Sequence, residues 1–267
     1  MLPADIAHAI DEAAPALGPF AALRYVAVAE STNDLALALA AAGEPEGVAV
    51  LAGEQRSGRG RRGRQWFSPP GAGLYLSVIL RPAAPPGALS LVTIAAGVAA
   101  ARAIERTCGL PVELKWPNDL VIGRPWRKIG GVLCEGVGAG IEAVVVGTGV
   151  NLQAAAYPRD VADRATSIEV ELGRPVDHAP IVVALLTELR RVSDRLRSSD
   201  RAWVCDEWRR LARAGLGTRV RWRDHQEQDR SGRARDIDAS GALLVDADGM
   251  TERLIAGEVI WEQLSRE

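Results

Sequence analysis

One ten-residue segment, Gly58–Phe67, constrains the fold of this chain most. It reads Gly-Arg-Gly-Arg-Arg-Gly-Arg-Gln-Trp-Phe, with four arginines and three glycines in its first seven residues. Glycine at this spacing disfavours both helix and strand, so we predict a mobile loop whose backbone N–H groups are free. The segment Leu74–Leu80 downstream has the residue alternation and the apolar end that are typical of a buried strand. The loop therefore leads into an apolar strand of a sheet.

The composition of this loop allows three interpretations. Backbone amides, guanidinium groups and an indole suit a phosphate-bearing nucleotide over which the loop closes. The same run resembles an Arg/Gly tail that binds nucleic acid, and arginine runs are also common on solvated surfaces. The net charge of the whole chain is only −2. The basic character is therefore local, which counts against a dedicated nucleic-acid binder.

The global composition describes an ordinary globular protein. The chain has 267 residues, of which 48% are hydrophobic and 25% are charged, enough for one large domain and a small one. Its cysteines, Cys108, Cys134 and Cys205, are odd in number and far apart, so we expect free thiols in the reducing cytoplasm. The longest apolar run, Leu91–Ala101, is too short to span a bilayer, and we expect no membrane association.

The order of the predicted elements indicates an α+β fold with a mixed sheet. Strands are predicted near residues 24–29, 48–55, 74–80, 112–116, 120–122, 129–136 and 141–150, and helices near 5–14, 32–42, 89–107, 181–196 and 203–211. Ser31-Thr-Asn33 supplies cap chemistry for the second helix. Beyond Ala214 the chain changes to short strands with turn signals. We therefore predict a catalytic domain over 1–214 and a small β-barrel domain over 215–267.

Three further segments carry polar residues at strand ends. Lys115-Trp-Pro-Asn-Asp119 turns the chain, and its ordinary interpretation is a β-turn capped by its own side chains. Arg127-Lys-Ile-Gly-Gly131 places a lysine at the mouth of a glycine-containing strand, where Lys128 could equally be an edge residue that reaches solvent. Gly147-Thr-Gly-Val-Asn151 ends a buried strand and could be a simple bulge, because no helix follows to form a dinucleotide fingerprint.

Taken together, these segments resemble the signature segments of biotin–protein ligases. The resembling segments, in chain order, are Ser31–Asp34, Gly53–Ser68, Lys115–Asp119 with Arg127–Gly131, and Gly147–Asn151. The resemblance covers about residues 24–267 and is most specific at the arginine loop and at Lys-Trp-Pro-Asn-Asp. The chain departs from the pattern at Arg56 and at Gly123–Trp126, which lengthens the turn before Lys128. The resemblance implies a mixed-sheet catalytic domain followed by an SH3-like barrel.

The resemblance also implies an activity and a set of site residues. The activity is ATP-dependent biotinylation of a lysine on the biotin carboxyl-carrier domain of a carboxylase, through biotinyl-5′-AMP, with Mg²⁺ sharing the phosphate charge. Catalytic roles fall on Lys128, Arg61 and Asp119. Biotin-side roles fall on Ser31, Thr32, Asn33, Gln55, Arg59, Gly60, Arg61, Lys128 and Gly131, and nucleotide-side roles on Arg64, Trp66, Asn118 and Asn151. No residue is assigned as a metal ligand.

Two alternatives and one expected absence accompany this hypothesis. A lipoate or octanoate ligase or transferase has a similar fold and carrier lysine, and an RNA-binding module would use the Arg/Gly loop differently. Bifunctional biotin ligases carry a winged helix-turn-helix domain of roughly sixty residues or more before the catalytic part. Here the first signature segment begins at Ser31, so we expect no direct DNA binding. A homodimer remains open as an alternative to a monomer.

Overall fold

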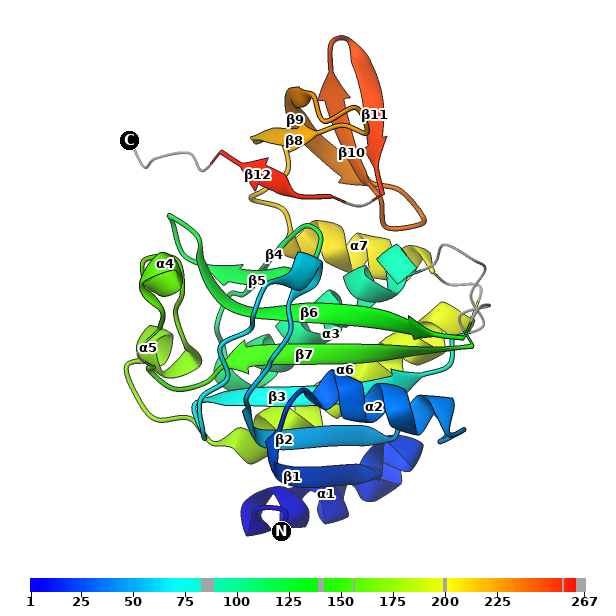
Figure 1. Cartoon of the computed structure of the whole chain (residues 1–267), viewed down its shortest axis with the longest axis vertical. Coiled ribbons are helices and arrows are strands. Elements are labelled where there is room, and N and C mark those ends of the chain that lie inside the picture. Colours follow the sequence, from blue (N-terminus) through cyan, green and yellow to red (C-terminus); the bar gives the residue numbers. More distant parts are fainter. Residues whose placement is uncertain (83–88, 139–141, 156, 199–200, 256, 263–267) are drawn as a thin grey trace.

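The computed structural model describes residues 1–82, 89–138, 142–155, 157–198, 201–255 and 257–262, which form two bodies (Figure 1). The larger body is built on a seven-stranded sheet in the order β1-β2-β3-β7-β6-β5-β4. Its strands are β1 (Leu23–Ala29), β2 (Ala49–Gln55), β3 (Gly73–Leu80), β4 (Glu113–Lys115), β5 (Asp119–Ile122), β6 (Arg127–Val137) and β7 (Ala143–Asn151). Strands β1 and β2 are parallel and the other neighbours are antiparallel. The predicted mixed sheet is confirmed.

Helices cover the two faces of this sheet unequally. The helical elements are α1 (Ala4–Leu17), η1 (Gly18–Ala21), α2 (Thr32–Ala41), η2 (Arg61–Gly63), α3 (Leu89–Cys108), α4 (Arg159–Ala162), α5 (Ile168–Leu172), α6 (His178–Arg197) and α7 (Ala202–Leu211). Helices α3 and α6 lie behind the sheet, whereas α2 lies in front of it (Figure 1). The buried alanines of α3 let its backbone approach the strands closely. The front face is therefore free to carry a site.

The β2–β3 connection is the loop that the sequence singles out. It rises across the front of β7 and β6 toward the smaller body (Figure 1). Strand β7 stays in unbroken register with both β3 and β6 through Gly147 and Gly149. The bulge considered for this segment is therefore wrong, and the register shift of this region lies between β5 and β6, at Leu120 and Val121.

The smaller body is a five-stranded antiparallel sheet in the order β11-β10-β9-β8-β12. Its strands are β8 (Arg219–Arg223), β9 (Asp229–Ile237), β10 (Leu243–Ala247), β11 (Met250–Leu254) and β12 (Val259–Trp261). Val220 and Trp222 are buried while the arginines between and beside them are exposed, as expected for a half-buried strand. Within the described residues the strand order has two ends, β11 and β12, and the predicted small all-β domain of short strands is confirmed.

Two tryptophans of the larger body join it to the smaller one. The Trp116 indole N–H donates to the carbonyl of Gly241 at 3.0 Å, and Trp116 is only 2% exposed. Trp126 packs edge-on against Trp261, with ring centroids 5.9 Å apart. Trp126 belongs to the lengthened turn Gly123–Trp126, so this departure from the family pattern forms part of the domain contact.

Candidate active site

The N-terminus of α2 is capped by a residue from a neighbouring strand. The predicted cap segment Ser31-Thr-Asn33 does begin the helix, with Ser31 at the N-cap position, but the Ser31 side chain makes no cap hydrogen bond. Instead, Gln55 Oε1 accepts from the Thr32 backbone N–H at 2.8 Å and from the Thr32 hydroxyl at 3.0 Å. Gln55 Nε2 donates to Ser68 Oγ at 2.9 Å. The structure thus brings Thr32 and Gln55, two predicted biotin-side residues, into direct contact.

Asn33 extends this polar network toward β6. Its Oδ1 accepts from the buried Ser77 hydroxyl at 2.6 Å, and its Nδ2 donates to Glu135 Oε2 at 2.6 Å and to the Leu133 carbonyl at 3.3 Å. Ser31, Thr32 and Asn33 are each less than 5% exposed. Burial requires polar groups to be hydrogen-bonded, and this network meets that requirement for Thr32 and Asn33.

The two glycines of Gly147-Thr-Gly149 make room for site side chains. A Cβ at Gly147 would lie 2.1 Å from Asn33 Oδ1, and a Cβ at Gly149 would lie 2.5 Å from Trp66 Nε1. Any larger residue would displace Asn33 or Trp66. The close approach is therefore the physical reason for these glycines.

The arginine loop has a defined conformation in this structure. The N–H groups of Gly60, Arg64 and Trp66 donate to the carbonyls of Arg64, Arg61 and Gly58 respectively. The expectation that the loop's amides are all free is therefore wrong for these three. Arg62 adopts the left-handed conformation, with φ 57°. Mobility of the free loop stays a prediction.

Lys128 lies between a carboxylate and an aromatic ring. Its Nζ is 2.5 Å from Asp119 Oδ1 and 5.3 Å from the Trp66 ring centroid. The side chains of Lys128 and Asp119 are 36% and 25% exposed. A Cβ at Gly131 would lie 3.4 Å from Lys128 Nζ, so glycine there leaves the ammonium room. Lys128 thus contacts two predicted site residues, while its catalytic role stays a prediction.

Arg61 connects the loop to both bodies. Its guanidinium donates to Asn118 Oδ1 at 3.4 Å and to the Gly257 carbonyl at 3.5 Å, both long contacts. Burial lowers the pKa of Arg61, and the nearby Asp119 carboxylate opposes that effect. Asn118 is itself fixed, since its Nδ2 donates to the Val132 carbonyl at 2.8 Å. An anion that replaced the long contacts of Arg61 would gain a charge-assisted partner.

The smaller body adds a carboxylate to this cluster. Glu258 pairs with Arg64, and the hydrogen bond from Arg64 lowers the pKa of Glu258. Lys115 on β4 lies opposite Asp119 on β5 in the register of the hairpin. Burial lowers the pKa of Lys115, and the charges of Lys128 and Arg164 act in the same direction. The cations therefore gather where the two bodies meet.

Asn151 lies behind Lys128. Its Nδ2 donates to the Thr166 carbonyl at 2.9 Å and to the Lys128 carbonyl at 3.5 Å. The Lys128 N–H donates to the Arg164 carbonyl at 2.6 Å, and the Thr166 N–H donates back to the Lys128 carbonyl. These contacts fix the backbone of Lys128, while direct contact of Asn151 with a nucleotide stays a prediction.

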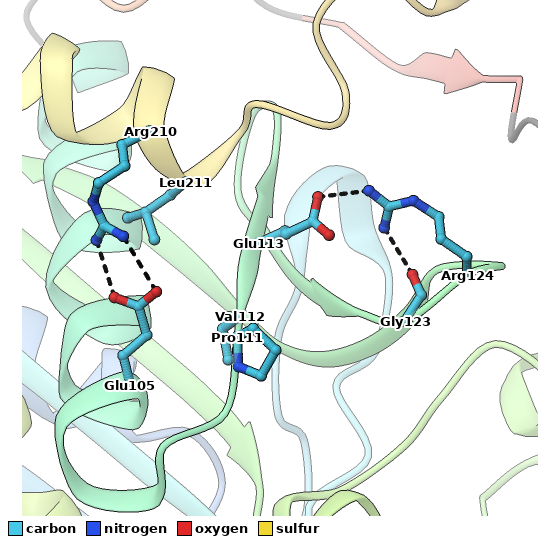
Figure 2. A pocket seen from close by; sticks show the side chains of 8 residues that line it. All are labelled: Glu105, Pro111, Val112, Glu113, Gly123, Arg124, Arg210 and Leu211. Atoms are coloured by element: carbon cyan, nitrogen blue, oxygen red, sulfur yellow. Dashed lines mark hydrogen bonds and ion pairs between the residues drawn. The ribbon is translucent and has the colours of Figure 1, made fainter.

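A groove of about 570 Å³ follows the loop. Its walls are residues 57–65 with Leu133 and Glu135. A second hollow of about 460 Å³ lies outside β4, beside α7, and two ion pairs line it: Glu105 with Arg210 at 3.0 Å and Glu113 with Arg124 at 2.8 Å (Figure 2). None of the predicted site residues lines this second hollow. The loop groove is the candidate active site.

Sequence reasoning missed several residues of this site. They are Ser68, Ser77, Lys115, Glu135, Arg164 and Glu258, which the structure brings to the predicted residues. Of these, Ser68 and Lys115 had a signal, because Ser68 ends the segment Gly53–Ser68 and Lys115 begins the Lys-Trp-Pro-Asn-Asp segment. In the described residues no group of three or more His, Cys, Asp or Glu side chains could hold a metal ion. Among those same residues, no helix combines the length and apolarity needed to cross a membrane.

Comparison with known proteins agrees with this architecture. The Biotin/lipoate A/B protein ligase family matches residues 25–151, and the Biotin protein ligase C terminal domain matches residues 215–261. The Biotin protein ligase of Aquifex aeolicus in complex with biotin and ATP superposes with a TM-score of 0.76 at 23% identity, over 91% of this chain and 99% of that one. The fold and site thus define a protein of the biotin/lipoate ligase class.

Sequence relatives narrow this class to one family. The Biotin--[acetyl-CoA-carboxylase] ligase of Mycobacterium tuberculosis is 36% identical, over 89% of this chain and 88% of the relative. The Bifunctional ligase/repressor BirA of Bacillus subtilis is 31% identical, over 89% of this chain and 73% of the relative. The chain belongs to the biotin protein ligase family.

Proposed function

We propose that this protein attaches biotin to a lysine of a biotin carboxyl-carrier domain, such as that of acetyl-CoA carboxylase, in two steps, of which the first consumes ATP. In the first step a carboxylate oxygen of biotin attacks the α-phosphorus of ATP. The bond from that phosphorus to the bridging oxygen breaks, which gives biotinyl-5′-AMP and pyrophosphate. In the second step the carrier lysine's amine attacks the acyl carbon, loses a proton and releases AMP.

The cluster around Lys128 is the observation that carries this proposal. Two anions must meet in the first step, so fixed cations are needed to offset their repulsion. Lys128 Nζ is fixed by Asp119 at 2.5 Å and faces the Trp66 ring, and Arg61 reaches Asn118, the residue before Asp119. Cations held in place before the reaction stabilise developing charge without reorganising. We assign this role to Lys128 and Arg61, with Asp119 positioning Lys128.

We assign the two substrates to two groups of residues next to the arginine loop. Thr32, Asn33 and Gln55 form the buried polar network at the N-terminus of α2, which suits the ureido and carboxyl groups of biotin. Trp66 provides an aromatic face for adenine, and its buried indole N–H has no hydrogen-bond partner in the described residues. Closure of the loop would shield the acyl-adenylate from water.

Mg²⁺ fits this site as a companion of the nucleotide. The site offers Asp119 and Glu258, each already paired with a cation, and Mg²⁺ is commonly bound by one or two carboxylates together with substrate phosphates. When bound, it would share the negative charge of the phosphates. The residues Lys128, Arg61 and Arg64 would bind the remaining charge.

The cellular setting belongs to the same proposal. Cys108, Cys134 and Cys205 are free thiols, which supports a cytoplasmic location. The net charge of −2 supports action without DNA or RNA.

An ATP–pyrophosphate exchange assay tests the function. The protein is mixed with ATP and labelled pyrophosphate, and biotin, lipoate, octanoate or RNA is added separately. Exchange that depends on biotin alone supports the proposal, and exchange with lipoate or octanoate would point to the related acyl ligases. No exchange with any acid would contradict the assignment. Transfer of label to a purified carrier domain, abolished when its lysine is replaced, tests the second step.

A further inference from the structure

Glu135 on β6 joins two site segments that lie far apart in the sequence. Its Oε2 accepts from Asn33 Nδ2 at 2.6 Å and from Arg59 Nη2 at 2.8 Å. Asn33 lies in the first turn of α2, and Arg59 lies near the start of the arginine loop. One carboxylate oxygen therefore links the buried polar network to the loop.

The contact with Glu135 fixes the orientation of the Asn33 amide. Both neighbours of Nδ2, Glu135 and the Leu133 carbonyl, accept hydrogen bonds, so the NH₂ group must face β6. Oδ1 then faces Ser77, whose hydroxyl donates to it at 2.6 Å. Without the carboxylate, only the longer 3.3 Å contact with Leu133 would hold the NH₂ group.

The contact with Glu135 also fixes the Arg59 guanidinium. Arg59 Nη2 lies 2.7 Å from Asp34 Oδ1 as well as 2.8 Å from Glu135 Oε2. The two carboxylates are not equivalent. The Asp34 side chain is 52% exposed, whereas that of Glu135 is 29% exposed and also holds Asn33. Exposed ion pairs contribute little, so Glu135 is the stronger anchor.

We propose that Glu135 is a positioning residue for biotin binding, which acts by holding Asn33 and Arg59 in one relative arrangement. This inference rests on the proposed function, because it takes both residues as biotin-side groups. Glu135 lines the loop groove but is separate from the Lys128–Asp119 pair that we assign to the chemistry. Its removal should therefore weaken biotin binding more than it slows catalysis.

The test measures biotin binding to the full chain by calorimetry without ATP, together with KM and kcat for pyrophosphate exchange. Because a hydrogen bond to a charged group is lost at two site residues, Glu135→Ala should weaken biotin binding by about tenfold or more. The kcat at saturating biotin should stay within about threefold of the parent value. Asp34→Ala, the matched control, removes the other carboxylate from Arg59 and should change binding by less than about threefold.

A double-mutant cycle separates positioning from a structural role. If Glu135 acts partly through Arg59, the combined variant Arg59→Ala with Glu135→Ala should bind biotin more tightly than the two single losses together predict, because the loss that passes through Arg59 is counted once while the loss through Asn33 remains. Glu135→Gln keeps an acceptor of the same size and should bind more tightly than Glu135→Ala. If Glu135→Ala does not fold, Glu135→Gln compared with Asp34→Asn takes its place, and weaker binding by Glu135→Gln than by Asp34→Asn supports the inference.

Three results would overturn the inference. The first is that Glu135→Ala binds biotin as tightly as the parent. The second is that the losses of Arg59→Ala and Glu135→Ala are fully additive in the cycle. The third is that Glu135→Ala lowers kcat alone and leaves biotin binding unchanged. Failure of the parent protein itself to bind biotin would instead overturn the proposed function. The two failures are therefore distinguishable in the same titration.

Discussion

The substitution Lys128→Ala separates catalysis from stability at this site. The Lys128–Asp119 pair is 2.5 Å long, but its side chains are 36% and 25% exposed, and pairs of this exposure typically contribute about 0–1 kcal/mol to stability. In the Lys128→Ala variant the Asp119 carboxylate would still have positive charge nearby, because Arg61 and Lys115 are close enough to interact with it electrostatically. The free energy of unfolding should therefore fall by about 1 kcal/mol or less.

The effect on the first chemical step should be much larger. Removing one preorganised group that stabilises developing charge typically costs about 10²–10³ in rate, or roughly 2.7–4 kcal/mol. Pyrophosphate exchange at saturating biotin and ATP measures this loss directly, and thermal unfolding checks the fold. Arg127→Ala is the matched control, because Arg127 is the adjacent residue but pairs with Glu171 at 2.8 Å, away from Asp119.

The reasoning would be refuted by near-normal exchange in the Lys128 variant. A rate within about threefold of the parent would show that Lys128 does not stabilise the developing charge. A comparable loss in Arg127→Ala would mean that any change at this end of β6 disturbs the site. Either result would remove the charge-stabilising role assigned to Lys128.

Three other predictions concern the loop and its glycine neighbours. Residues 58–68 should be cleaved by a protease in the free protein and protected by biotin with ATP, because the arginines gain anionic partners only in the complex; equal cleavage would contradict ligand-driven closure. Arg61→Gly should release biotinyl-5′-AMP and label an unrelated lysine-rich protein, and labelling no greater than with the parent would exclude a retention role. Gly149→Ala should weaken ATP binding by about tenfold through a Cβ 2.5 Å from Trp66 Nε1, whereas Gly147→Ala, whose Cβ would meet Asn33, should weaken biotin binding. Titrating each of these two glycine variants separately with ATP and with biotin tests the last prediction. If both variants weakened the two ligands equally, the assignment would be refuted.

The sequence by itself determined the sheet and the identity of the main site segments. Strands such as β3 and β7 are rich in apolar residues, and α3 repeats its apolar residues at helical spacing, so local pattern is enough to locate them. The short helices α4 and α5 were missed because four or five residues carry too little periodicity. For α5, the Ser167 cap and Gly173 were the available signals.

Only the tertiary structure decided how the site segments meet. The cap of α2 comes from Gln55, the anchor of Asn33 and Arg59 is Glu135, and the partner of Arg64 is Glu258, each from a different part of the chain. No local pattern encodes such contacts, because they depend on strand order and on which face each side chain takes. The sequence determined which residue types are present, and the folding of the sheet determined which charges became neighbours.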